Sequence, residues 1–361
     1  MPGPQEPSTT PSRSEPVAIG LIGTGEIARI LLPQLADSSC RFVSVTDLNR
    51  DAAQAFAKDH GDLRVEDSVD ALAAAEDIDA VFVATPPGSH RPLIEQCVGH
   101  GKHVLCEKPL TTGPDEALAL REFEAAHPDL KLACCSSRFR CTPSARVAGE
   151  LHRGGELGAL RDVRLRASVS LPRPLDAVPE WRRKPGAGGL VSDWCVYELE
   201  WLRGVFGAAF DPVSVHAVTD DFGREGMGVD SGYHVTVGCG SGAFVRLTRI
   251  AEIGPRQHGV ELRWERGGLD VPFAPDAQDL SIHEYRAGEE GKIETTTHDA
   301  SGPQWGDILI GPLENFARAV RNEESLLAPI GTQVVVQAAI HAIQESAATG
   351  RVVELPSAAI G

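Results

Sequence analysis

The chain has 361 residues, of which 42% are hydrophobic and 24% charged, and its formal net charge is −17. That length favours two domains, each large enough to bury its own core. The acidic balance argues against a nucleic-acid partner, which needs a clustered basic face, and no apolar run approaches the roughly 20 residues of a membrane span.

The first fifteen residues are rich in Pro, Ser and Thr and contain no apolar segment of the kind that a signal peptide carries. We expect residues 1–15 to form a disordered lead. The eight cysteines show neither C-x-x-C spacing nor a Cys/His zinc pattern, and most stand within apolar runs. They are predicted to be reduced core residues of a cytoplasmic protein, and no metal site is implied.

A glycine turn follows the first apolar run, 17–22, and reads Gly23-Thr24-Gly25-Glu26-Ile27-Ala28. A helical pattern at 27–35 comes next. In this context the first glycine permits the turn, the second lets the backbone approach a pyrophosphate, and the alanine allows close packing of helix on strand. The turn therefore predicts a dinucleotide-binding site.

Asp47 ends the second predicted strand, 42–46, where a carboxylate would accept hydrogen bonds from the adenosine ribose. NAD is favoured because a carboxylate repels the 2′-phosphate of NADP. Arg50 is close enough in sequence to keep NADP open.

Strands and helices then alternate regularly as far as residue 138. The strands are predicted at 79–85, 102–106 and 130–136, and the helices at 51–60, 68–76, 90–99 and 115–126. This alternation predicts an α/β domain over residues 16–138, a doubly wound parallel sheet of the Rossmann type.

Ligands of such sheets bind beyond the carboxyl ends of the strands. Thr85 and Pro86 follow one strand and Glu107 and Lys108 another, so all four are predicted at the cofactor site. His90 opens the next helix, with Ser89 as its expected cap. For His90, a cofactor-side role and simple capping both fit the pattern.

The pattern changes after residue 138. A helix at 143–152 precedes alternating strand-like runs, which are predicted at 160–170, 232–238, 243–250 and 260–264. This favours an α+β domain over 139–330 with an open, mainly antiparallel sheet. Such a sheet is often covered by another subunit, so we expect a homodimer or homotetramer. The final segment, 331–361, carries a helix at 332–348 that we expect to pack back on the first domain.

A glycine-led stretch from Gly186 to Gly207 predicts a further helix. It places Asp193 and Tyr197 four residues apart on one face, with Glu200, opposite an apolar stripe of Cys195, Leu199, Leu202 and Phe206. Two readings fit: a helix that lines a cleft with proton-handling groups, or a solvated acidic face.

The chain resembles the Gfo/Idh/MocA oxidoreductases. The most specific match is Glu107-Lys108-Pro109 at a strand end. The others are the glycine turn, Ala84–His90, Gly101–Cys106, Arg138-Phe139, Gly155–Gly158, Trp181-Arg182, Gly188-Gly189 with Asp193, and Ala339–Val353. The resemblance implies a Rossmann domain for NAD(H) or NADP(H), a second domain whose sheet mediates oligomers, and reversible hydride transfer at a secondary alcohol of a sugar or cyclitol.

By this resemblance Lys108 is the catalytic lysine, while residues 193–197 stand where the family has Asp-x-Gly-x-His. Here Cys195 replaces the glycine and Tyr197 the histidine, as in some members. We expect Tyr197 to exchange the proton with the substrate hydroxyl, Lys108 to assist, and Asp193 to orient the substrate or share the proton path. The alternative makes Lys108 the acid/base and Tyr197 its hydrogen-bond partner. Arg182 is predicted to contact the nicotinamide side or the substrate.

The substrate is less constrained. Glu198 and Glu200 beside the expected site would suit a cationic amino sugar or aminoglycoside. Arg182, Arg183 and Lys184 would instead suit the diphosphate of a nucleotide-linked keto sugar. A non-catalytic NAD- or sugar-sensing regulator on the same fold is the alternative from another functional class.

Overall fold

A computed structural model describes residues 15–35, 38–61, 63–169, 179–183, 188–220, 229–251, 258–275, 277, 279–289, 292–302 and 304–355. The lead expected at 1–15 lies outside these ranges except for Glu15, and Lys184 and Gly186 also lie outside them. The chain divides into two compact units. The first contains residues up to Ser136 together with Leu309–Gln333, and the second contains Ser137–Ile308 and the residues from Val334 onward.

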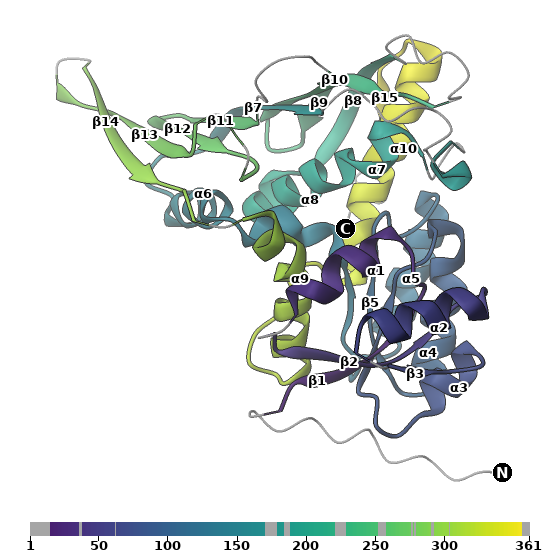
Figure 1. The fold of residues 1–361 in the computed structure, drawn as a ribbon. Coiled ribbons are helices and arrows are strands. Elements are labelled where there is room, and N and C mark those ends of the chain that lie inside the picture. Colours follow the sequence, from purple (N-terminus) through teal and green to yellow (C-terminus); the bar gives the residue numbers. More distant parts are fainter. Residues whose placement is uncertain are drawn as a thin grey trace. The chain divides into compact units, whose positions relative to one another are not determined.

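The first unit is built on a six-stranded parallel sheet in the order β3-β2-β1-β4-β5-β6. This confirms the predicted doubly wound sheet. The strands are β1 (Val17–Ile22), β2 (Cys40–Thr46), β3 (Arg64–Val65), β4 (Ala80–Val83), β5 (His103–Cys106) and β6 (Leu132–Cys134). Figure 1 labels β1, β2, β3 and β5 among them, together with the helices α1 (Glu26–Leu31), α2 (Arg50–Asp59), α3 (Val69–Ala74), α4 (His90–Gly99) and α5 (Pro114–Ala125).

Helices cover both faces of this sheet. Alternate residues of β4 point to opposite faces, so that Phe82 joins one apolar cluster and Val83 the other. The first cluster includes residues of α1, α2 and α9 (Trp305–Val320), and the second includes residues of α3, α4 and α5. Local caps fix two of the helix starts, because the side chains of Asn49 and Ser68 accept hydrogen bonds from the backbone of α2 and α3.

The second unit is built on a nine-stranded sheet in the order β14-β13-β12-β11-β7-β10-β9-β8-β15. β7 and β10 pair in parallel and the other pairs are antiparallel, so the predicted mainly antiparallel sheet is confirmed. The predicted strands are β7 (Leu160–Val169), β9 (Gly232–Cys239), β10 (Phe244–Ala251) and β11 (Gly259–Trp264). The sequence patterns missed β8 (Pro212–Asp220), β12 (Gly267–Pro272), β13 (Ser281–Ala287), β14 (Ile293–Asp299) and β15 (Val353–Glu354).

One face of the second sheet is packed by helices α6 (Pro143–Gly154), α8 (Cys195–Phe206) and α10 (Gln333–Thr349), with the short helix α7 (Gly189–Asp193) before α8 (Figure 1). In β9, Tyr233, Val235 and Val237 are buried on this face, while His234 and Thr236 point away from it. The core lies between the helices and that inner face.

The last helix departs from expectation. α10 contributes Val336, Ala339 and Ile340 to the core of the second unit, whereas we expected it to pack on the first. The first unit is covered instead by α9, whose Leu313 and Phe316 are fully buried there. An apolar stripe identifies a packing helix, but it does not identify the surface that the helix packs on.

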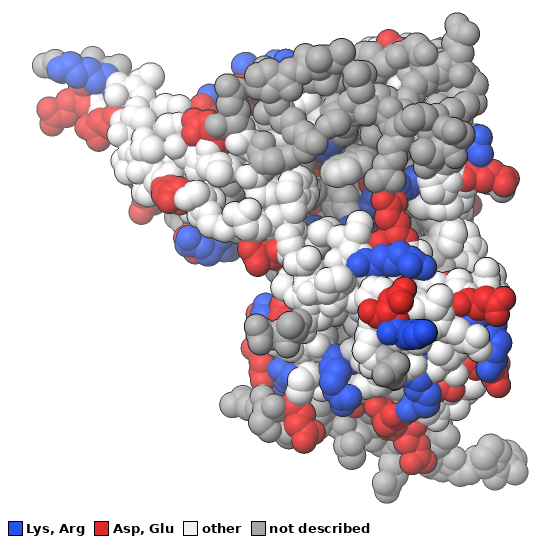
Figure 2. Space-filling model, viewed as in Figure 1, with Lys and Arg blue, Asp and Glu red and all other residues white. Residues whose placement is uncertain are grey.

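Three further findings concern membrane-spanning helices, surface charge and the cysteines. No helix within the described ranges is long and apolar enough to cross a membrane. On the face drawn in Figure 2, acidic and basic side chains are interspersed over the first unit. All eight cysteines are free thiols and seven of them are buried, as predicted for core residues.

Candidate active site

The glycine turn lies directly after β1 in the first unit. Gly23 has φ +97°, and a Cβ atom there would lie 2.6 Å from the carbonyl oxygen of Ala84, so both the conformation and the close approach require glycine. A Cβ on Gly25 would meet nothing within 4 Å. Gly25 therefore leaves open space at the start of α1, which fits the approach of a pyrophosphate.

Asp47 stands at the carboxyl end of β2, beside that turn. Its Oδ2 accepts hydrogen bonds from the backbone N (2.8 Å) and Oγ1 (2.9 Å) of Thr24, and its Oδ1 accepts from the backbone N of Asn49 at 2.9 Å. These bonds fix the carboxylate next to the glycine turn, where the ribose was predicted. Arg50, which kept NADP open, forms an ion pair with Asp67.

The ends of β4 and β5 carry the other predicted cofactor residues. Because β4 and β5 are neighbours in a parallel sheet, Thr85 and Lys108 emerge at the same edge. Thr85 is half-buried and Pro86 is exposed. Glu107 is buried and accepts from the backbone N of Lys108 at 3.0 Å, and the Lys108–Pro109 peptide bond is cis. Lys108 is half-buried.

His90 lies between two backbone carbonyl groups. The ring is fully buried; Nε2 lies 2.7 Å from the carbonyl oxygen of Thr85 and Nδ1 lies 3.1 Å from that of Leu110. Burial lowers the pKa of His90, with the two carbonyl contacts opposing the shift. His90 thus ties the chain after β4 to the chain after Lys108. The expected cap at Ser89 is also corrected, since its Oγ bonds to Thr85 and Pro86 and not to the helix.

In the second unit the predicted single helix is broken. α7 ends at Asp193, Trp194 leaves the helical path with φ −118° and ψ −35°, and α8 begins at Cys195. Asp193 and Tyr197 therefore belong to different helices. The alternative reading of a solvated acidic face is wrong, because Tyr197 is 3% exposed and Glu200 is 1% exposed.

Each of the two candidate catalytic side chains in the second unit meets an arginine. Arg182, in the 3₁₀ helix η5 (Glu180–Arg183), has its Nε 3.9 Å from Oδ2 of Asp193, and its guanidinium lies over the ring of Trp181. Arg138, in the 3₁₀ helix η3 (Cys135–Cys141), donates a hydrogen bond from Nη1 to Oη of Tyr197. Arg182 was predicted at the cofactor or the substrate, and the structure brings it to Asp193. Arg138 was noted only as part of a family match.

The glycines before Asp193 position α7. Gly189 has φ +81°, and a Cβ atom there would overlap the carboxylate of Asp230. That carboxylate accepts a hydrogen bond from the backbone N of Val191 at 2.8 Å, and the carbonyl of Asp230 accepts from Leu190 at 3.1 Å. Asp230 therefore caps α7 from the neighbouring strand segment, which a side chain on Gly189 would prevent.

Glu198 and Glu200 were expected beside the site, and both are already paired. Glu198 accepts from Arg249 Nε at 2.9 Å and from Tyr233 Oη at 2.7 Å, with all three side chains buried. Glu200 forms an ion pair with Arg140 at 3.1 Å. Neither carboxylate is open to a cationic substrate, so this part of the substrate argument is wrong.

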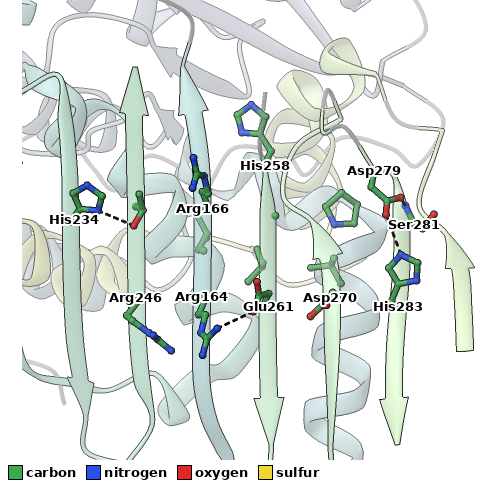
Figure 3. Close-up of a pocket in the computed structure, with 16 residues that line it drawn as sticks. Arg164, Arg166, His234, Arg246, His258, Glu261, Asp270, Asp279, Ser281 and His283 are labelled. Atoms are coloured by element: carbon green, nitrogen blue, oxygen red, sulfur yellow. Dashed lines mark hydrogen bonds and ion pairs between the residues drawn. The ribbon is translucent and has the colours of Figure 1, made fainter. Parts of the chain in front are cut away.

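A separate hollow of about 620 Å³ lies on the outer face of the second sheet (Figure 3). His234, His258 and His283 line it together with Arg164 and neighbouring strand residues, and none of the predicted catalytic residues is among them. His234 contacts Thr248 Oγ1 at 3.2 Å, and His283 contacts Asp279 at 3.2 Å. Among the described residues, no group of His, Cys, Asp or Glu is arranged to hold a metal ion.

Comparison with known proteins assigns both units. A family model described as "Oxidoreductase family, NAD-binding Rossmann fold" matches residues 17–131, and the "GFO/IDH/MocA C-terminal domain" matches residues 145–270. D-xylose 1-dehydrogenase (NADP(+)) 2 of Haloferax volcanii is 30% identical over 339 residues, which cover 93% of this chain and 99% of that protein. Inositol 2-dehydrogenase of Rhizobium meliloti is 25% identical over 342 residues, covering 91% and 97%.

The solved structures agree on the fold. A levoglucosan dehydrogenase in complex with NADH superposes with a TM-score of 0.79 at 19% identity, covering 95% of this chain and 100% of that one. The chain therefore belongs to the Gfo/Idh/MocA family of oxidoreductases, and its first unit is that family's NAD-binding Rossmann domain.

Proposed function

We propose that this protein catalyses reversible, NAD(P)-dependent hydride transfer between a secondary hydroxyl and a ketone of a neutral sugar or cyclitol. The observation that carries the proposal is the arrangement around the Trp194 break. Asp193 and Tyr197 stand on either side of it, and each is held by an arginine. On a solvated acidic surface, neither side chain would need an arginine partner.

The first unit fits the cofactor. Gly23, Thr24, Gly25, Glu26 and Ile27 would hold the pyrophosphate, since the turn leaves open space at Gly25. Asp47 would meet the adenosine ribose, and NAD is the favoured form because this carboxylate would repel the 2′-phosphate of NADP. Thr85, Pro86 and Glu107 stand at the neighbouring strand ends. When bound, the nicotinamide ring supplies or accepts the hydride.

The chain's own residues handle the proton. In the oxidation direction Tyr197 takes the proton of the substrate hydroxyl, and in the reduction direction it returns a proton to the carbonyl oxygen. Lys108 assists by placing an ammonium near that oxygen, which favours its negatively charged form. Asp193, held by Arg182, orients the substrate.

A neutral substrate is favoured over the amino sugar or aminoglycoside that Glu198 and Glu200 suggested. Those carboxylates are neutralised by Arg249 and Arg140, so nothing in their placement selects a cation. The compounds in the names of two relatives, D-xylose 1-dehydrogenase (NADP(+)) 2 and inositol 2-dehydrogenase, are also neutral.

A second candidate is the reduction of a nucleotide-linked keto sugar. A dTDP-3,4-didehydro-2,6-dideoxy-alpha-D-glucose 3-reductase of Actinomadura kijaniata is 31% identical over 191 residues, which cover 52% of this chain and 56% of that protein. Arg183 could serve a diphosphate, since its buried Nε atom has no hydrogen-bond partner within the described part of the chain. Arg182 is less suited to that role because it pairs with Asp193.

We also propose that copies of the chain associate through the outer face of the second sheet. Opposite charges are already paired across its strands, with Arg164 near Glu261 at 3.5 Å and Arg263 on Asp270 at 2.5 Å. A face of balanced charge can meet a second copy of itself without net repulsion. Sedimentation equilibrium tests this, and a monomer at all concentrations would contradict it.

The activity test is a screen of NAD⁺ and NADP⁺ reduction with D-xylose, myo-inositol, glucosamine and an aminoglycoside, repeated with Tyr197→Phe and Lys108→Met. We expect turnover of a neutral compound and a loss of about 10²–10⁴-fold in each variant. Tyr285→Phe is the matched control, since Tyr285 bonds Asp270 on β12, away from α8. Near-normal turnover in Tyr197→Phe would assign the acid/base role to Lys108 instead of Tyr197. Tight NAD⁺ binding without reduction by any compound would overturn the enzymatic proposal.

A further inference from the structure

We propose that Arg138 is a positioning residue for Tyr197: its fixed positive charge favours the phenolate form and holds the oxygen in one place. The inference rests on the proposed role of Tyr197 as proton carrier. It adds a residue to which the sequence patterns gave no role.

The contact between the two side chains is direct and shielded from water. Arg138 Nη1 donates to Tyr197 Oη, and the guanidinium carbon lies 5.8 Å from the centroid of the Tyr197 ring. Arg138 is 5% exposed and Tyr197 is 3% exposed. Electrostatic interactions between groups this buried are screened less than surface pairs.

Aromatic packing fixes the orientation of the phenol. The Tyr197 ring meets Phe139 edge to face at 5.2 Å and 78°, and meets Trp194 at 5.7 Å and 66°. Phe139 is itself stacked on Phe273 at 4.6 Å. Because the ring is packed on two sides, the Tyr197 oxygen is held where it accepts the hydrogen bond from Arg138.

Three carboxylates on α7 and α8 are paired with arginines other than Arg138. Asp193 on α7 faces Arg182, and on α8 Glu198 faces Arg249 and Glu200 faces Arg140. Within the described residues, Arg138 is the arginine that donates a hydrogen bond to the Tyr197 oxygen. A guanidinium stays protonated across the working range of pH, so it supplies a constant charge and takes no part in proton exchange.

The chemical step follows from this arrangement. In oxidation, the substrate O–H bond breaks and its proton joins the Tyr197 oxygen, while the carbon gives its hydride to NAD(P)⁺ and becomes a carbonyl carbon. Arg138 neither gains nor loses a proton. It lowers the energy of the phenolate that accepts the proton, since an opposite charge within hydrogen-bond distance favours the charged form.

The same 3₁₀ helix provides a matched control. Arg140 lies two residues beyond Arg138 and pairs with Glu200, one helical turn beyond Tyr197. Arg140→Met therefore removes a comparable link between η3 and α8 and leaves the Tyr197 oxygen untouched. A purely structural role for Arg138 predicts that the two losses have similar effects.

The experiment measures ionisation of Tyr197 directly, by ultraviolet difference titration of phenolate in the full-length protein with and without Tyr197→Phe. The chain has three tyrosines, so the Tyr197 contribution can be isolated by subtraction. Arg138→Gln keeps a hydrogen-bond donor and removes the charge, while Arg138→Lys restores the charge. We expect Arg138→Gln to move the ionisation of Tyr197 upward by about one pH unit or more. Arg138→Lys should reverse most of that move, and Arg140→Met should leave it unchanged.

The pH profile of kcat with NAD⁺ and D-xylose or myo-inositol should move in parallel, with kcat reduced more than KM is raised. An unchanged titration in Arg138→Gln, or an equal shift in Arg140→Met, would overturn the inference. If the titration shifts as expected but no sugar or cyclitol is oxidised, the effect of Arg138 on Tyr197 stands and the proposed function fails. Circular dichroism of Arg138→Gln and Arg140→Met checks that both variants are folded, and the return of the titration in Arg138→Lys shows that the site itself is intact.

Discussion

Asp230 allows a quantitative test of how α7 is held. Its carboxylate accepts from the backbone N of Val191 at 2.8 Å, and burial raises the pKa of Asp230 to about 6 from its ordinary 3.8. The hydrogen bonds from α7 oppose that shift but do not cancel it. The perturbation is Asp230→Asn, which keeps an oxygen acceptor for Val191 and cannot ionise.

The sign and size of the effect follow from linkage. Between about pH 4 and pH 6 the folded protein retains a proton on Asp230 that the unfolded chain has lost. The contribution of Asp230 to stability therefore falls as pH rises through that window. A shift of about 2 pKa units corresponds to about 3 kcal/mol.

Urea unfolding followed by tryptophan fluorescence measures this contribution. The five tryptophans, at positions 181, 194, 201, 264 and 305, all lie in the second unit, so the signal reports the unit that contains α7. We expect the free energy of unfolding of Asp230→Asn to rise relative to the unsubstituted protein by about 3 kcal/mol between pH 4 and pH 7. Taking the difference between the two proteins removes the titration of the other groups.

Asp299→Asn is the control of opposite sign. Hydrogen bonds from Ser301 lower the pKa of Asp299, so that substitution should lose stability relative to the unsubstituted protein as pH rises. A difference between Asp230→Asn and the unsubstituted protein that stays flat from pH 4 to pH 7 would refute the reasoning. It would mean that Asp230 is ionised in the folded protein throughout.

Two other substitutions test the cofactor turn and the buried ion pair. Gly23→Ala should lower the free energy of unfolding by about 1–3 kcal/mol and abolish the NAD⁺ binding measured by calorimetry, because its Cβ would meet the Ala84 carbonyl at φ +97°. Gly25→Ala should abolish NAD⁺ binding with little loss of stability. Equal losses of stability in the two variants would contradict this expectation. Arg249→Met should destabilise the second unit by about 3–5 kcal/mol because Glu198 is left buried without its partner. Adding Glu198→Gln should recover most of that loss, whereas strictly additive costs in a double-mutant cycle would contradict the pairing.

The first unit was predictable because its rules are local. Alternation of strand and helix patterns specifies a parallel sheet, and the glycine turn after β1 marks the edge where ligands bind. Asp47, Thr85 and Lys108 could be placed at that edge from their positions at strand ends alone. The burial of His90 could not be predicted, since it depends on carbonyls of Thr85 and Leu110 that only the folded chain brings together.

The second unit was less predictable because its strands carry weaker patterns. β14 is exposed along its whole length, so no alternation of apolar residues marks it, and β12 begins with two glycines. For α8 the predicted environment of the polar residues was wrong. Tyr197, Glu198 and Glu200 are all buried, so a helical wheel that assigns polar residues to a solvated face gives the wrong environment.

The polar residues of α8 are buried because arginines far away in sequence neutralise or bond them. Glu198 meets Arg249 from β10, and Glu200 meets Arg140 from η3. A wheel contains no information on partners outside its own helix. What the sequence does contain is Arg138 and Arg140 in a stretch dominated by small and apolar residues, 132–145. Charged residues in such a stretch are buried only if they are paired. Arginines flanked by apolar residues therefore predict polar or charged partners elsewhere in the chain. The partner of Arg138 is Tyr197, the proposed proton carrier.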